Sequence, residues 1–159
     1  MVKMLKASVV VTVTVLLGMG AVVLGVRAQY PPVVNAVRRL LRDRGNPGQL
    51  RTAGAPGQAN GVIEHVGRTS GRTYRTPVTP VATPEGFVVA LPYGPTTDWV
   101  RNVVAAGSAT LVLDGETIPV DRPEVRPLAD FRTRLTTGTR LATSIFGVQS
   151  CLVLQRAGS

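Results

Sequence analysis

The sequence predicts a mainly β (α+β) fold, a small antiparallel barrel of six strands with short helices, preceded by an N-terminal transmembrane helix. Three observations lead to this prediction. The 159 residues include 17 Gly and 12 Pro, which interrupt the chain too often for a helical bundle and favour short strands. Asp114 and Gly115 lie between two β-prone apolar runs, which is a strong signal for a tight hairpin. Residues 7–26 contain no charge, and a helix of that length would span the roughly 30 Å of a bilayer core.

The uncharged run allows two interpretations. It is longer than the roughly 7–15 apolar residues of a signal peptide, which favours a retained membrane anchor formed by residues 1–27. Five arginines follow the run between residues 27 and 44, whereas only Lys3 and Lys6 precede it. The positive-inside rule then predicts a single-pass protein of the inner (plasma) membrane with its catalytic domain in the cytoplasm. In the alternative interpretation the run is a secretory signal and the protein is secreted after cleavage near Ala28, because residues 26–28 resemble a small-x-small cleavage site.

Residues 28–60 are predicted to form a basic amphipathic helix and a Gly/Pro-rich linker. Pro31 and Pro32 suit a helix start, and valine or leucine recurs at helical spacing up to Leu41, with arginines between and beyond, up to Arg44. Such a helix can lie on anionic membrane lipid, which would make lipid a partner of the N-terminal segment, or it can pack on the domain as an ordinary surface helix. Residues 45–61 carry five Gly and two Pro, which indicates a linker or mobile loop.

Residues 61–157 are predicted to form the barrel domain. Pro77 and Pro80 cannot donate to a strand ladder, so they indicate an edge or a bulge in the segment that contains them. The expected strands are residues 62–66, 72–81, 87–91, 109–113, 116–120 and 150–154.

Two short helices are expected to accompany these strands. Thr97 or Asp98 would cap a helix that runs to residue 106, and Gly107 would follow its C-terminus. A second helix is expected over residues 127–140, where Leu128, Phe131 and Leu135 lie on one stripe.

Charge and composition exclude several classes of protein. The chain has 18 Lys+Arg and 9 Asp+Glu, but eight of the basic residues and only one of the acids lie in residues 1–60. A nucleic-acid binder would usually carry its basic surface on the folded domain, so we expect no nucleic-acid partner. With one His and one Cys we expect no disulfide and no metal site. His65 is expected to be a hydrogen-bonded structural residue, and Cys151 a buried packing residue.

The segment with the clearest chemistry is the turn at residues 67–72, which reads G-R-T-S-G-R. It combines flexible glycines, hydroxyl donors, backbone N–H groups and guanidinium groups, which are the components of an anion site. Arg75 adds a third cation, although strand alternation places it on the face opposite Arg72. As a pattern by itself, the segment is also typical of a solvated hairpin turn.

Two runs of the chain together resemble a known family. Residues 67–77 (G-R-T-S-G-R-T-Y-R-T-P) and residues 91–102 (L-P-Y-G-P-T-T-D-W-V-R-N) are similar to motifs of the deazaflavin (F420)-dependent nitroreductase family. Members of that family are split β-barrel oxidoreductases that use the reduced deazaflavin coenzyme F420. The resemblance covers about residues 61–125, with a weaker likeness at the C-terminal strand.

The resemblance implies a set of cofactor-binding residues. The first run would bind the phosphate and acidic tail of the cofactor, and the second would line the deazaflavin pocket or the tail site. Tyr93 would be the proton donor or polar contact of the acceptor, or else a loop tyrosine that packs its ring. Many members carry a second basic residue where Thr69 stands here, and the Tyr-rich C-terminal segment of the nitroimidazole-reducing members has no counterpart. The residues implied in cofactor binding are Arg68, Thr69, Ser70, Gly71, Arg72, Arg75, Pro92, Tyr93, Gly94, Asp98, Trp99 and Arg101.

The resemblance also implies a function, an F420H2-dependent oxidoreductase that transfers a hydride from the reduced deazaflavin to a small acceptor. The deazaflavin supplies that chemistry itself, so the protein needs no nucleophile or catalytic dyad. Because the domain is predicted to be tethered to a membrane, we expect a lipophilic acceptor, a quinone-like or nitro compound. The alternative belongs to another class of protein. It is a non-catalytic barrel that binds a ligand or a protein partner and that could be exported.

Overall fold

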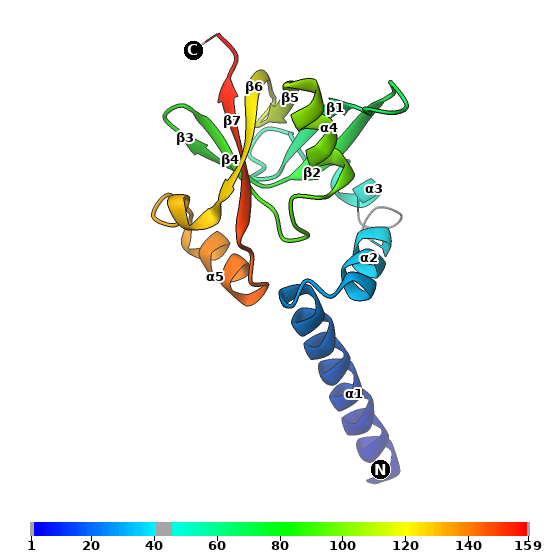
Figure 1. Ribbon diagram of the computed structural model, residues 1–159. Coiled ribbons are helices and arrows are strands. Elements are labelled where there is room, and N and C mark those ends of the chain that lie inside the picture. Colours follow the sequence, from blue (N-terminus) through cyan, green and yellow to red (C-terminus); the bar gives the residue numbers. More distant parts are fainter. Residues whose placement is uncertain (1, 41–45, 159) are drawn as a thin grey trace.

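The computed structural model describes residues 2–40 and 46–158, with side chains from residue 12 onward except at residues 46 and 47. Seven strands form one curved antiparallel sheet, with short helices around it and a long helix projecting from it (Figure 1). The mainly β, antiparallel prediction is confirmed. The strands are β1 (Gly61–Val66), β2 (Thr73–Val78), β3 (Pro80–Thr83), β4 (Gly86–Ala90), β5 (Ser108–Leu113), β6 (Glu116–Pro127) and β7 (Ser150–Arg156).

The prediction of six strands was wrong, because the segment 72–81 contains two strands. The strand order is β2-β1-β5-β6-β7-β4-β3, so β2 and β3 follow each other in sequence but lie at opposite edges of the sheet. Only Thr79 separates them, which means that the sheet curls until its two edges meet at this corner. Pro77 and Pro80 lie in these edge strands, as predicted, where a missing N–H costs no ladder bond.

The core fills the concave side of the curled sheet. Successive strand residues point to opposite faces, so Phe87 and Val89 join the main core cluster whereas Val88 joins a smaller one on the other face. Burial of each such side chain contributes about 1.5–3 kcal/mol. Cys151 is fully buried in the smaller cluster, as predicted, and burial, together with the nearby carboxylate of Asp130, raises the pKa of its thiol to about 11.

The helix α4 (Asp98–Ala106) closes one end of the main core with Val100 and Val103. It begins after Thr97 and ends before Gly107, as predicted; Gly107 has a φ of 71°, which suits glycine at this position. The predicted hairpin is also confirmed. Asp114 and Gly115 connect β5 to β6 with φ values of 52° and 79°, the left-handed values that a two-residue turn of this kind requires.

The prediction of one helix over residues 127–140 was wrong. The chain instead forms the 3₁₀ helix η2 (Leu128–Phe131), several turns, and the helix α5 (Thr137–Ile145). Thr136 starts α5, because its side-chain oxygen accepts a hydrogen bond from the backbone N–H of Thr139 at 3.2 Å. Leu128 and Leu135 are both buried in the smaller cluster, so the apolar spacing reports burial on the sheet and not one continuous helix.

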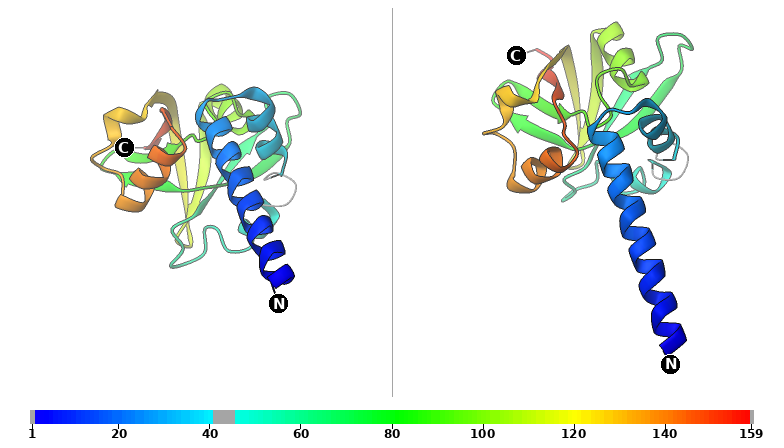
Figure 2. Two further views of the ribbon diagram at one scale, coloured as in Figure 1. Left: turned by 90° about the horizontal axis from the view of Figure 1, so that it is seen from below. Right: turned by 60° about the horizontal axis from the view of Figure 1, so that its bottom comes forward.

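The N-terminal region forms three helices, α1 (Val2–Arg27), α2 (Pro31–Leu40) and α3 (Asn46–Gln49). Helix α1 projects away from the barrel, with the N-terminus at its far end, and α2 folds back beside the sheet (Figures 1 and 2). The last predicted part of the amphipathic helix, residues 41–44, lies outside the described residues. Residues 50–60 form turns that contact the β5–β6 hairpin, where Gly115 N–H donates to the Gly54 carbonyl at 2.6 Å.

The predicted transmembrane helix is not supported by this structure. Within its described residues, no single helix has both the length and the apolar character of a membrane span. Residues 12–27 and α2 meet that criterion only as a pair, and the chain between them bends by 110°.

Candidate functional site

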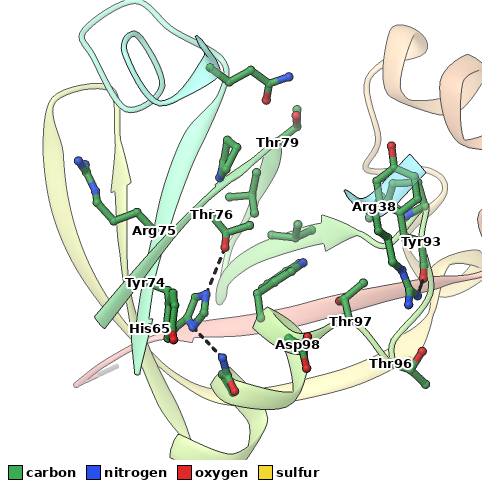
Figure 3. A pocket seen from close by; sticks show the side chains of 18 of the residues that line it. Arg38, His65, Tyr74, Arg75, Thr76, Thr79, Tyr93, Thr96, Thr97 and Asp98 are labelled. Atoms are coloured by element: carbon green, nitrogen blue, oxygen red, sulfur yellow. Dashed lines mark hydrogen bonds between the residues drawn. The ribbon is translucent and has the colours of Figure 1, made fainter. Parts of the chain in front are cut away.

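A pocket of about 1180 Å³ lies beside β1 and β2. Its walls come from β1 and β2, the loop before α4, the first turns of α4, and the helices α2 and α5 (Figure 3). The pocket is larger than the roughly 300–1,000 Å³ of typical small-molecule sites. It brings together segments that are far apart in the sequence, including the two runs, residues 67–77 and 91–102, that carry the family resemblance.

Arg68 joins these two runs. Its Nη2 donates to Asp98 Oδ1 at 3.1 Å, and its Nη1 donates to Asn102 Oδ1 at 2.8 Å. The backbone N–H of Arg68 reaches the same Asn102 oxygen at 3.2 Å. A turn of the first run is thereby fixed to the first two turns of α4, which positions the pocket wall.

The bonds from Arg68 continue into a buried polar chain. Because Asn102 Oδ1 accepts two of them, the amide nitrogen of Asn102 faces His65 Nδ1, at 3.3 Å. Nδ1 therefore accepts, and the ring proton is on Nε2, from which it is donated to Thr76 Oγ1 at 3.2 Å (Figure 3). The hydroxyl proton of Thr76 is then free to be donated to another group, and Thr76 lines the pocket.

His65 is held neutral by its surroundings. It is 4% exposed, and burial lowers the pKa of its imidazole below the ordinary value of 6.5. Tyr74, opposite His65 on β2, stacks on the ring at a centroid distance of 5.9 Å. His65 is thus the hydrogen-bonded residue that was predicted, and it also forms part of the pocket wall, which was not predicted.

The loop before α4 carries Tyr93. Burial raises the pKa of the Tyr93 phenol, so the hydroxyl keeps its proton at neutral pH. Two side chains from the N-terminal region fix the backbone of this loop. Gln29 Nε2 donates to the Pro92 carbonyl at 3.4 Å, and Arg38 Nη2 donates to the next carbonyl, that of Tyr93. Tyr93 is therefore presented to the pocket by a loop held at two consecutive carbonyls.

Two polar atoms of the pocket lining are buried without a hydrogen-bond partner in the described part of the chain. They are Thr97 Oγ1 and Arg38 Nε. Thr97 occupies the N-cap position of α4, but its side chain forms no cap bond. An unsatisfied buried hydroxyl costs about 1–3 kcal/mol, and a bound molecule with a polar group could remove that cost.

The predicted cofactor-binding residues divide into two groups. The residues of the first group line the pocket; they are Arg68, Thr69, Ser70, Arg75, Pro92, Tyr93, Asp98 and Trp99. The lining does not include Gly71, Arg72, Gly94 and Arg101.

The predicted cluster of three cations is not a cluster of free charges. Arg68 is paired with Asp98 at 3.1 Å, and Arg75 Nε is paired with Glu64 Oε1 at 3.0 Å across β1 and β2. Arg72 precedes β2 and is exposed. The turn itself is compact, because Gly67 N–H donates to the Arg72 carbonyl at 2.8 Å and a Cβ on Gly67 would lie 2.7 Å from the Tyr74 ring.

The part of the pocket near α5 is partly apolar. Its lining there consists of Ala142, Phe146 and the nearby Val148 together with Thr139 and Thr143, and Val89 and Ala90 of β4 also belong to the lining. The site thus combines the hydrogen-bonded series Arg68–Asn102–His65–Thr76 with apolar side chains near α5. Such a lining suits an amphipathic ligand.

Sequence reasoning missed several lining residues, notably Asn102, Thr76, Arg38 and Phe146. Asn102 is the last residue of the second run and is buried on α4, and a buried polar residue on an apolar helix face is a signal that could have been used. Arg38 carried no such signal, because its role depends on α2 folding back onto the loop at Tyr93. Among the described residues, no group of three His, Cys, Asp or Glu side chains could hold a metal ion.

No family model and no curated protein matches the chain. Solved structures do show a similar chain path. A protein of the pyridoxine-phosphate oxidase family from Clostridium acetobutylicum, related to general stress protein 26 of B. subtilis, is 10% identical with a TM-score of 0.47, over 74% of this chain and 84% of that one. A protein of unknown function from Agrobacterium tumefaciens is 17% identical with a TM-score of 0.44, over 62% of this chain and 49% of that one.

An F420-H2 dependent reductase is also among the similar structures, at 15% identity and a TM-score of 0.39, over 60% of this chain and 94% of that one. At these identities and TM-scores the likeness assigns neither a cofactor nor an activity.

Proposed function

We propose that the chain is an F420H2-dependent reductase that reduces a small lipophilic acceptor, quinone-like or a nitro compound. The observation that supports this proposal best is the contact of the two resembling runs at Arg68. Its guanidinium bonds Asp98 and Asn102 of the second run, at 3.1 and 2.8 Å, so both runs form one wall of one pocket. Runs that were similar to the family by chance would not need to meet.

The residues present fit a deazaflavin. The pocket volume of about 1180 Å³ is sufficient for a tricyclic ring with its side chain and an acceptor. Thr97 Oγ1 is buried without a partner in the described residues, and the Thr76 hydroxyl has a proton to donate. Two hydroxyls are thus available to a ring that carries carbonyl oxygens, while Trp99 and Phe146 offer apolar contact.

The chain's own residues have three tasks in this proposal. The deazaflavin, when bound, supplies a hydride, so the protein must hold the ring and the acceptor close together and exclude water. The hydrogen-bonded series Arg68–Asn102–His65–Thr76 orients the Thr76 hydroxyl before the ligand binds, so that this group need not reorganise during the reaction. The Tyr93 phenol, protonated at neutral pH, is positioned to donate a hydrogen bond or a proton to the acceptor.

We also propose that the N-terminal segment associates with lipid of the inner membrane and that the barrel lies on the cytoplasmic side. Large apolar side chains of α1 are exposed, among them Leu16, Leu17 and Leu24 at 61%, 70% and 66%. Such a surface on one helix is a site for lipid or protein, and the arginines that follow it favour the cytoplasmic side. A lipophilic acceptor would then be at high concentration near the pocket.

Binding of F420H2 by the full chain in detergent tests the proposal. Titration followed by cofactor fluorescence should show saturable binding in the micromolar range or tighter. Arg68→Ala should weaken binding at least roughly tenfold, because it removes charge-assisted bonds that hold the wall. Arg132→Ala is the matched control, since Arg132 is exposed and lies outside the pocket lining.

Two results would contradict the proposal. One is the absence of binding by the unaltered chain, which would leave the non-catalytic barrel as the better interpretation. The other is equal loss of binding in the Arg68 and Arg132 variants, which would mean that the pocket is not where the cofactor binds. A thermal unfolding curve of Arg68→Ala distinguishes loss of the site from loss of the fold.

A further inference from the structure

The positive charge of the pocket is not where the sequence motif placed it. Four arginines belong to the lining, and two of them form ion pairs. Arg68 pairs with Asp98 at 3.1 Å, and Arg75 pairs with Glu64 at 3.0 Å. The other two, Arg38 and Arg39, belong to α2. Neither has an ion-pair partner within the described residues. As far as the described residues go, the uncompensated charge of the pocket therefore lies on α2, outside the barrel.

Helix α2 is fixed against the pocket by the turn that precedes it. Arg27 Nη1 donates to the Ser144 carbonyl of α5 at 2.8 Å, and Gln29 Nε2 donates to the Pro92 carbonyl at 3.4 Å. Val26 and Val34, on either side of this turn, are 1% and 4% exposed. These contacts attach the turn both to α5 and to the loop before α4.

Arg38 and Arg39 differ in what they do there. Arg38 donates to the Tyr93 carbonyl, a neutral acceptor that leaves the guanidinium charge uncompensated, and its Nε is buried without a partner in the described chain. Arg39 is exposed at the pocket lining, and no hydrogen bond or ion pair involves it in the described part of the molecule. Within the described residues, Arg39 thus offers all its donors to a ligand in a pocket whose lining also contains the charge of Arg38.

We propose that Arg39, supported by the charge of Arg38, is an anion subsite that binds a phosphate group of the pocket ligand. Guanidinium groups bind phosphate through two parallel hydrogen bonds, and a second cation nearby strengthens the attraction where solvent is partly excluded. The ligand has its phosphate at α2 and its apolar body toward Phe146 and Val148. In taking that ligand to be the cofactor, this inference rests on the proposed function; the subsite itself does not.

The test compares Arg39→Gln with Arg132→Gln in the full chain in detergent, with three probes. The probes are inorganic pyrophosphate, F420H2, and the deazaflavin nucleoside that lacks the phosphate. Arg39→Gln should weaken binding of pyrophosphate and of F420H2 at least roughly tenfold, as expected for loss of a charge-assisted contact. Binding of the nucleoside and the thermal unfolding midpoint should stay unchanged, because Arg39 has no partner in the described residues to lose.

Salt and a conservative variant sharpen the result. Arg39→Lys should restore part of the affinity, and added salt should weaken F420H2 binding less in Arg39→Gln than in the unaltered chain. The inference is overturned if pyrophosphate and F420H2 bind Arg39→Gln as they bind the unaltered chain. It is also overturned if the variant loses only its binding to phosphatidylglycerol vesicles, since Arg39 would then serve lipid headgroups at the membrane surface.

The outcome for the proposed function is separate. If the unaltered chain binds pyrophosphate through Arg39 but does not bind F420H2, the anion subsite is supported and the assignment of the cofactor is wrong. If it binds F420H2 equally well with and without Arg39, the cofactor assignment is supported and the subsite is wrong.

Discussion

At the scale of single residues, one series of polar side chains organises the pocket, and its bonding leaves the Thr76 hydroxyl proton free. Asn102 is 6% exposed and His65 is 4% exposed, and groups this well buried must bond to each other or pay a desolvation cost. In the hydrogen-bonded series Arg68–Asn102–His65–Thr76, each side chain fixes the orientation of the next. The result is a Thr76 hydroxyl that accepts from His65 and keeps its own proton to donate, which is a preorganised contact for a ligand oxygen.

His65 should make the stability of the fold depend on pH. Burial lowers the pKa of His65 in the folded state, so the unfolded chain, with a pKa near 6.5, binds a proton more readily. The free energy of unfolding should therefore be unaffected above about pH 7 and should fall as the pH drops through 6.5. Urea unfolding from about pH 8 to about pH 5 measures this, and since the chain has one histidine, one ring signal in NMR reports the titration.

The matched variant is His65→Gln, which keeps a side-chain donor but does not titrate. The decline between about pH 7 and pH 5 should be smaller in this variant, because carboxylates, which remain in both proteins, titrate mainly at lower pH. An equal decline in both proteins would mean that His65 is not the group responsible. A ring signal that titrates at or above the ordinary value would contradict the buried, neutral state directly.

The sequence predicted these residues unevenly. Arg68, Asp98 and Trp99 were found because they stand in runs of recognisable residues, and the structure places them in one pocket lining. Asn102 was quoted within the second run without a role, since nothing in a sequence says which polar residue of a short helix will be buried. Arg68 and Arg75 were assigned to an anion site as free cations. Their carboxylate partners, Asp98 and Glu64, come close to them only in the folded chain, so the sequence could not show that the two charges are paired.

At the scale of elements, local signals were sufficient where the structure is local. The turn at Asp114 and Gly115 and the end of α4 at Gly107 depend on backbone conformations that few residues adopt, and both were predicted. The segment 72–81 could not be divided by such signals, because β2 and β3 are separate only in their partners, β1 and β4. The prediction of one helix over residues 127–140 was wrong for a related reason. The leucines of this apolar stripe are buried against the sheet, which does not require them to lie on one helix.

Gly86 should be essential to the pairing of β4 with β7. A Cβ at this position would fall against the Leu154 carbonyl oxygen and 2.8 Å from the Gln155 Cα, and neither backbone atom can move without breaking the ladder between these strands. Gly86→Ala should therefore lower the free energy of unfolding by at least about 1–3 kcal/mol, the usual cost of overpacking. Urea unfolding of the full chain in detergent provides the measurement.

Gly138→Ala is the control for this prediction. Nothing lies within 4 Å of a Cβ at Gly138, which is in the first turn of α5. Alanine is the better helix former, so this variant should be as stable as the unaltered chain or more stable by up to about 1 kcal/mol. If Gly86→Ala is tolerated equally well, the close approach of β4 and β7 is wrong.

At the scale of the whole molecule, the N-terminal region contacts the barrel and shares the lining of its pocket. The turn between α1 and α2 contacts α5 through Arg27 and the Tyr93 loop through Gln29 and Arg38. The segment predicted as a basic amphipathic helix and linker, residues 28–60, therefore also supplies part of the pocket lining. Packing of this helix on the domain was one of the two alternatives that the sequence left open, but its contact with the Tyr93 loop could not be predicted, because it depends on a bend that returns α2 to the barrel (Figure 2).

The exposed apolar surface of α1 should bind the full chain to anionic lipid vesicles. Leu17 of α1 is 70% exposed, and burial of one leucine in lipid is worth about 1.5–3 kcal/mol. Replacing it by a charged residue removes that gain and adds repulsion from the anionic headgroups. Leu17→Glu should therefore lower the partition coefficient between phosphatidylglycerol vesicles and water, measured by co-sedimentation, at least roughly tenfold.

Leu141→Glu is the matched control for this prediction, because Leu141 on α5 is 63% exposed and should not contact lipid. Equal loss in both variants would show that vesicle binding does not depend on α1, and no loss in either would show that the apolar surface of α1 has another partner.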